Sequence, residues 1–149
     1  MSKKQNIQPL LDAAQNQLGL TISTGDSLDS KLLAILGFDA ALLIFALQSE
    51  LPASLWVLLP ALITLLVSLG LSVFSIWPRS YKGGSVDVIK HAEYLSLEED
   101  ELAVQILSDT QEAIMTNSDI NAARSKYCIV AIISSITGIF FLGGCILLV

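Results

Sequence analysis

LWVLLPALITLLVSLGLSVFSIW, residues 55–77, contains no charged residue and consists mostly of large apolar side chains. The uncharged run around it extends from residue 51 to residue 78, and a second uncharged run covers residues 127–149. A helix needs about 20 mainly apolar residues to cross the hydrocarbon core of a bilayer, and both runs reach that length. The sequence therefore predicts an all-α integral membrane protein and excludes an ordinary soluble enzyme.

A third membrane span is expected ahead of these two runs. Residues 32–47 are apolar apart from Asp39, with Lys31 just before them and Glu50 beyond their end. This stretch is at the short end of the lengths that cross a bilayer. We therefore predict three transmembrane helices, with a tight hairpin between the first two: residues 32–47, 55–77 and 128–149.

The composition excludes further classes of function. Charged residues make up only 15% of the chain and the net charge is −6, so no basic stripe exists for nucleic acid. One histidine and two cysteines cannot form a usual zinc site. Cys128 and Cys145 would lie about 25 Å apart along one helix, too far for a disulfide. With no catalytic motif either, we expect no enzyme activity, metal or cofactor.

The basic residues indicate how the chain is oriented. They precede the first span or lie between the second and third spans, whereas the hairpin and the C-terminus have none. Basic residues favour the cytoplasmic side of a membrane. We therefore predict a cytoplasmic N-terminus, a cytoplasmic segment over residues 78–127 and a C-terminus on the opposite side. The basic residues are Lys3, Lys4, Lys31, Arg79, Lys82, Lys90, Arg124 and Lys126.

Both predicted cytoplasmic segments, residues 1–31 and 78–127, are expected to be helical. In the first, apolar residues at helical spacing predict a helix that ends at Gly19. A new helix, capped by Asp26 or Ser27, would then lead into the first span.

The second cytoplasmic segment is expected to hold a short helix over residues 86–94. Ser96-Leu-Glu-Glu99 has the form of a capping box, which marks the start of a helix. No glycine or proline follows until Gly138, so this helix is predicted to run unbroken into the third span.

Asp39 is the candidate for a residue that lines a pore or controls a conformational switch. It would lie about 12 Å into the first span, where a carboxylate costs about 2.5 to 3.5 kcal/mol on insertion scales. An acid in a membrane span is a functional candidate, but it can equally serve as a structural hydrogen-bonding residue between helices. Its partner would be the same residue of a second subunit or a hydroxyl such as that of Thr64, Ser68, Ser134 or Thr137.

Small residues four positions apart occur in all three spans. The pairs are Gly37 with Ala41, Ser68 with Ser72, and Ser134 with Gly138. Such pairs allow helices to approach closely, either within one chain or between subunits. Three thin helices make a poor membrane fold on their own, so we expect a homo-oligomer.

Basic and aromatic residues gather at the predicted cytoplasmic membrane edge of all three spans. They could hold a phosphate while an aromatic ring stacks on a base. They could equally be ordinary contacts with lipid headgroups. The candidate ligand-binding residues are Lys31, Arg79, Tyr81, Lys82, Arg124 and Lys126.

Three short motifs occur in a recognisable order. Asp29-Ser-Lys31 precedes the first span, the second span ends in Ile76-Trp-Pro-Arg79, and Asn121 to Lys126-Tyr127 leads into the third span. From about Asp26 onward, this order and spacing resemble the Pycsar-type transmembrane effectors, and the related SMODS-associated transmembrane effectors, of bacterial anti-phage defence. The positions that match are Asp29, Lys31, Arg79 and Lys126.

The resemblance implies an effector in the bacterial inner membrane that responds to a cyclic nucleotide from a partner cyclase and disrupts the membrane. The chain departs from this pattern in having a small cytoplasmic part with no recognisable nucleotide-binding domain. A ligand site would then be shared between subunits or built at the membrane edge. The alternatives are a structural or accessory membrane subunit that docks a cytoplasmic partner, and a holin-like pore.

Overall fold

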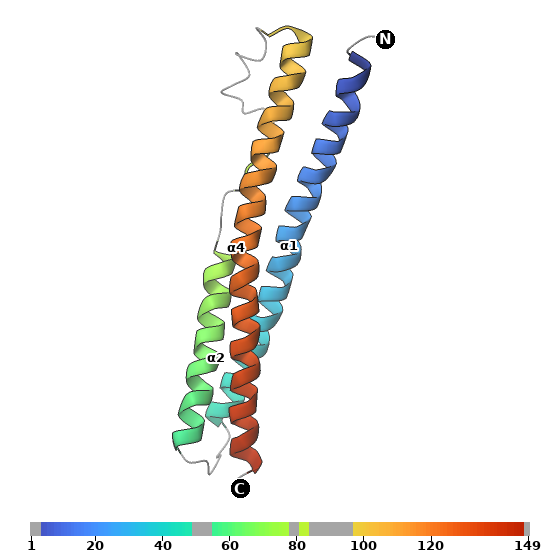
Figure 1. Cartoon of the computed structure of the whole chain (residues 1–149). Helices are drawn as coiled ribbons and strands as arrows, with labels where there is room; N and C mark the ends of the chain where they lie inside the picture. The colour runs from blue at the N-terminus through green and yellow to red at the C-terminus, as the bar shows by residue number, and fades with distance from the viewer. Residues whose placement is uncertain (1–3, 49–54, 78–80, 84–96, 148–149) are drawn as a thin grey trace. The chain divides into compact units, whose positions relative to one another are not determined.

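The computed structural model describes residues 4–48, 55–77, 81–83 and 97–147 (Figure 1). Every regular element in these ranges is an α-helix, and each of the three helices is long and apolar enough to cross a membrane. The predicted all-α fold with three membrane-spanning helices is therefore confirmed. The helices are α1 (Lys4–Gln48), α2 (Leu55–Ile76) and α4 (Glu99–Leu147).

The predicted break in the first helix is wrong, because α1 continues through Gly19 and past Asp26. A glycine ends a helix when it adopts a left-handed conformation, and no described glycine has a positive φ. The hydroxyls of Thr21 and Thr24 donate to carbonyl oxygens one turn earlier in α1, at 2.8 Å each. These threonines thus form their hydrogen bonds within the helix, and a glycine alone costs a helix only about 1 kcal/mol.

The helix α4 runs unbroken from Glu99 to Leu147, as predicted. The backbone N–H of Leu102 donates to the carbonyl oxygen of Glu98 at 2.8 Å, which marks the start of the helix. Ser96, the first residue of the predicted capping box, and the short helix predicted over residues 86–94 lie outside the described residues, as does the predicted hairpin.

The chain divides into two compact units. Unit 1 comprises residues 1–26 and 79–122, and unit 2 comprises residues 27–78 and 123–149. Consequently α1 and α4 each contribute residues to both units, whereas α2 belongs to unit 2 alone. In unit 2, α1 and α4 run parallel to each other and α2 runs antiparallel to both (Figure 1).

The interior of unit 2 is apolar at one end, whereas elsewhere polar side chains lie among buried apolar ones such as Leu32 and Ala131. We call Ala46, Ala61, Leu65 and Leu142 the apolar cluster; all four are buried and pack together. Large apolar side chains instead cover the outside of unit 2, as expected for a surface that faces lipid. They include Phe38, Ile44, Leu66, Val73, Ile133 and Phe140.

Buried residues recur every three or four positions along α2 and α4. In α2 they are Ala61, Leu65, Ser68, Ser72 and Ser75. In α4 the same spacing runs through Thr110, Ala113, Asn117, Asn121, Arg124, Cys128, Ala131, Ser135, Gly138 and Leu142. This is the spacing of a coiled-coil seam, but here many seam positions carry polar side chains. Arg124, one of the functional candidates, lies on the seam of α4, and the buried Asp39 of α1 bonds to Ser135 on the same seam.

Candidate functional site

Arg124 joins all three helices of unit 2. Its side chain is 3% exposed, and its Nη2 donates to Oδ1 of Asp29 on α1. Its Nε donates to the carbonyl oxygen of Ser75, in the last turn of α2, at 3.0 Å. The last four carbonyl groups of a helix have no partner within that helix, and an arginine can supply one. Arg124 therefore caps α2 and forms an ion pair with α1 at the same time.

Asp39 is completely buried in unit 2. The hydroxyl of Ser135 on α4 donates to Oδ1 of Asp39 at 2.6 Å. The predicted kind of partner, a hydroxyl, is therefore correct, but the serine is the neighbour of the predicted Ser134. The other predicted hydroxyls bond elsewhere: Thr64 to carbonyls of its own helix, Ser68 to the carbonyl of Ala131, and Thr137 to the carbonyl of Ile133.

Buried polar side chains continue between Asp39 and Arg124. We call Asp39, Ser135, Ser68, Ser72 and Ser75 the polar column. Within the described part of the chain, three oxygen atoms of this column are buried without a hydrogen-bond partner: Oδ2 of Asp39, Oγ of Ser72 and Oγ of Ser75. Native proteins contain few such atoms, and each one calls for an explanation.

The small-residue pairs have different surroundings. Ser68 and Ser72 are both buried within unit 2. Gly138 is buried as well, and a Cβ atom added to it would lie 2.7 Å from Cγ of Leu65. These positions serve packing within one chain. Gly37 and Ala41 are instead exposed on α1.

In unit 1, two asparagines of α4 hold residues 81–83 and α1. Oδ1 of Asn117 accepts the backbone N–H of Lys82 at 2.9 Å, and Nδ2 of Asn117 donates to the Lys82 carbonyl at 2.8 Å. One turn later, Nδ2 of Asn121 donates to the carbonyl of Thr21 at 2.7 Å, and its Oδ1 accepts the hydroxyl of Tyr81 at 2.7 Å. Both asparagines are buried and use donor and acceptor together.

Gly25 makes room for this arrangement. A Cβ atom at this position would lie 2.6 Å from the hydroxyl oxygen of Tyr81 and 3.2 Å from Oδ1 of Asn121. Any larger residue would therefore displace the tyrosine from the asparagine. Gly19, in the same helix, has open space around it.

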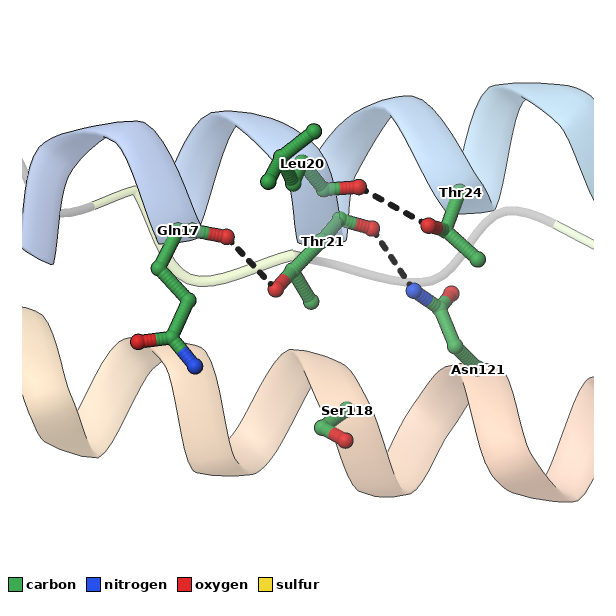
Figure 2. Close-up of a pocket in the computed structure, with 6 residues that line it drawn as sticks. All are labelled: Gln17, Leu20, Thr21, Thr24, Ser118 and Asn121. Carbon is green, nitrogen blue, oxygen red and sulfur yellow. Dashed lines mark hydrogen bonds between the residues drawn. The ribbon is translucent and has the colours of Figure 1, made fainter. Parts of the chain in front are cut away.

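Beside Asn121, unit 1 has a small open pocket of about 190 Å³ between α1 and α4. Figure 2 shows Gln17 and Thr21 on α1 and Ser118 and Asn121 across from them on α4, with the dashed hydrogen bond from Asn121 to the Thr21 carbonyl. The lining contains amides and hydroxyls but no charged group. Among the described residues, no group of three His, Cys, Asp or Glu side chains is placed to hold a metal.

The six predicted ligand-binding residues fall into both units and have different surroundings. In unit 1, Tyr81 bonds to Asn121, and Lys82 forms an exposed ion pair with Glu112 at 2.6 Å. In unit 2, Arg124 is buried against Asp29, whereas Lys31 and Lys126 are exposed. Arg79 lies outside the described residues. Lys31, Lys82 and Lys126 are therefore the exposed basic side chains among the described residues of the set, and Lys82 is already paired with Glu112.

Sequence reasoning missed the roles of Asn117, Asn121, Ser135 and Gly25. A usable signal was present, because polar residues recur along α4 at the spacing of a buried seam. A search for apolar stripes passes over such a seam.

A family model for the Pycsar effector protein domain matches residues 13–149. The match leaves out residues 1–12 and includes most of both units and of the three helices. No curated protein and no solved structure matches the chain significantly. The predicted family resemblance is thereby confirmed: the chain belongs to the Pycsar effector family and is a membrane effector of anti-phage defence.

Proposed function

We propose that this protein responds to a cyclic-nucleotide signal from a partner cyclase by rearranging a homo-oligomer, and that the rearranged state makes the bacterial inner membrane permeable. In this proposal residues 1–31 and 78–127 are cytoplasmic and sense the signal. Residues 32–77 and 128–149 form the membrane part, and the C-terminus lies in the periplasm. The protein itself carries out no chemical reaction.

The observation that carries the proposal is the complete burial of Asp39 in an apolar helix, with one oxygen bonded to Ser135 and the other without a partner. A buried carboxyl group in a membrane span lowers the stability of the protein. Such a group is therefore a candidate for a functional role. An effector that admits water to its interior gives Asp39 such a role, because hydration would supply the missing hydrogen bond. A purely structural membrane subunit gains nothing from the unpartnered oxygen.

The division into two units supports the proposed coupling. Because α1 and α4 each contribute to both units, a change at unit 1 can pass to unit 2 along two covalently continuous helices. The signal shifts the equilibrium only if it binds the active state more tightly than the resting state. Lys31 and Lys126 are exposed, whereas the exposed Lys82 is paired with Glu112, so we propose Lys31 and Lys126, together with Arg79, as contacts for the phosphate of the ligand.

The test is expression of the protein in bacteria with and without co-expressed cyclic-nucleotide synthases, with growth and membrane potential as readouts. We expect depolarisation with one synthase and none with a catalytically inactive form of that synthase. Depolarisation that needs no synthase would contradict the signal response and favour a holin-like pore. A normal potential under every condition would contradict the effector mechanism and favour the structural subunit.

A further inference from the structure

The polar column stops abruptly at the apolar cluster. On α4, Arg124 and Ser135 bound the column, and Leu142 in the cluster follows two turns later. At 1.5 Å per residue the column is about 16 Å long and the step from Ser135 to Leu142 is about 10 Å. The interior of unit 2 therefore holds polar side chains among buried apolar ones, such as Leu32 and Ala131, over one stretch, and the apolar cluster over the next.

The unpartnered atoms of the column are all oxygens that water could satisfy. A buried polar group without a partner costs about 1 to 3 kcal/mol. Parting the helices would let water bond to Oδ2 of Asp39 and to the hydroxyls of Ser72 and Ser75. Hydration of the column is thus favoured locally, and what opposes it must lie elsewhere in unit 2.

The apolar cluster supplies that opposition. Leu65 and Ala61 are completely buried, and Leu142 is 4% exposed. Gly138 brings α4 so close to α2 that a Cβ atom would lie 2.7 Å from Leu65. The hydroxyl of Thr64 also lies beside Gly138, but it donates to carbonyl oxygens of its own helix. A narrow constriction lined mainly by aliphatic groups excludes water and thereby blocks ions, as in channels that gate by dewetting.

We propose that the apolar cluster is a hydrophobic gate and that the polar column, once the gate parts, conducts cations. This inference rests on the proposed membrane permeabilisation and names its path and its ion selectivity. The column offers hydroxyl and carboxyl oxygens, and its one acidic residue is Asp39. The neighbouring basic group, Arg124, is already paired with Asp29. Oxygen ligands and an acidic side chain favour cations over anions.

The gate is tested by placing a hydroxyl in the cluster. Purified Leu65→Ser protein in vesicles of phosphatidylcholine with a minor fraction of phosphatidylglycerol, without any nucleotide, should release potassium roughly tenfold faster than wild type. The matched control is Leu66→Ser, one residue along on the outer surface, where the side chain is 57% exposed. Leu142→Ser with the control Phe140→Ser repeats the test on α4, in case one variant does not fold.

The result that would overturn the gate is equal potassium release by wild type and by both cluster variants, each shown by circular dichroism to be helical and inserted in the vesicles. No signal molecule is involved, so this failure is separable from that of the proposed function. If wild type still depolarised cells with a synthase, the effector function would stand and the gate would be wrong.

Ion selectivity is tested on the same vesicles under a potassium chloride gradient. For Leu65→Ser we expect a reversal potential with the sign set by potassium. In the double variant that combines Leu65→Ser with Asp39→Asn, the reversal potential should lie closer to zero. A double variant with Asp119→Asn, an exposed acid of unit 1, should leave it unchanged. A reversal potential near zero for Leu65→Ser, or one set by chloride, would contradict a cation path.

Discussion

Arg124 on α4 donates to the carboxylate of Asp29 on α1, and the same guanidinium donates to the last turn of α2 through the Ser75 carbonyl. The arginine is buried, whereas the Asp29 side chain is 38% exposed. One side chain thus ties the three helices of unit 2 together at the Arg124 end of the polar column. Arginine suits this position because its planar group can donate to two partners in different directions.

Replacing Arg124 with methionine should destabilise the protein on the order of 2 kcal/mol. Loss of one partner from a fully buried ion pair costs about 3 to 5 kcal/mol, and the partial exposure of Asp29 lowers that value. The measurement is the unfolding midpoint of the purified protein in detergent.

Arg124→Lys should recover only part of the stability lost in Arg124→Met. An ammonium group is a single point charge on a flexible chain and does not reproduce the planar fork of the guanidinium. Lys126→Met, an exposed control, should change little, and equal midpoints for Arg124→Met and Lys126→Met would contradict the role of Arg124.

Gly25→Ala and Gly19→Ala should have different effects although both lie in α1. At Gly19 the added methyl meets open space, so the helix gains up to about 1 kcal/mol of stability. At Gly25 the methyl displaces the Tyr81 hydroxyl, and loss of the bond to Asn121 offsets that gain by about 1 kcal/mol. Unfolding midpoints test this prediction, and an equal increase in both variants would show that Tyr81 does not need the space at Gly25.

Asn117→Ala should release residues 81–83 from α4. The asparagine alone provides both the acceptor and the donor for the Lys82 backbone. Hydrogen exchange at the Lys82 amide should therefore become faster by roughly fivefold or more, since one lost hydrogen bond is worth about 1 kcal/mol or more. Glu112→Gln, which weakens the exposed ion pair with the Lys82 side chain, should leave this amide protected. Unchanged exchange in Asn117→Ala would contradict the contact.

The general fold follows from the sequence because the signals for membrane helices are long and unambiguous. Uncharged runs gave the second and third spans, and the absence of breakers gave the unbroken α4. The helix end predicted at Gly19 is wrong, because a glycine without a left-handed conformation interrupts nothing. Local residue type could not decide this point.

The interior contacts were harder to predict, because in a membrane the usual contrast between apolar inside and polar outside is lost. The apolar side chains of Leu66 and Phe140 face outward, while Asp39, Ser68 and Ser135 lie inside. Asp39 was recognisable as an exception within an apolar run. Its partner was predicted as a hydroxyl on the second or third span or as a second subunit, and Ser135 was not among the hydroxyls named, since helix rotation cannot be fixed from hydropathy when both faces are apolar.

Lys126→Glu should abolish the response to the synthase while leaving the protein folded and in the membrane. The Lys126 side chain is exposed, so reversing its charge should disturb the phosphate of a ligand more than the fold. Lys126→Arg keeps the charge and should respond normally. The measurement is membrane potential in cells that co-express the activating synthase, with Lys31→Glu as a parallel variant. Normal depolarisation by both charge-reversed variants would exclude these lysines from the ligand site.

The central claim is that the buried Asp39 serves permeabilisation, and one comparison tests it most directly. Membrane potential is recorded in bacteria that co-express the activating synthase with wild type, Asp39→Leu or the exposed control Asp119→Leu, at equal amounts of membrane-inserted protein. We predict that wild type and Asp119→Leu depolarise the cells, whereas Asp39→Leu leaves the potential intact. Depolarisation by Asp39→Leu at the wild-type level would contradict the account, because the carboxyl group would then be only a structural hydrogen-bonding residue.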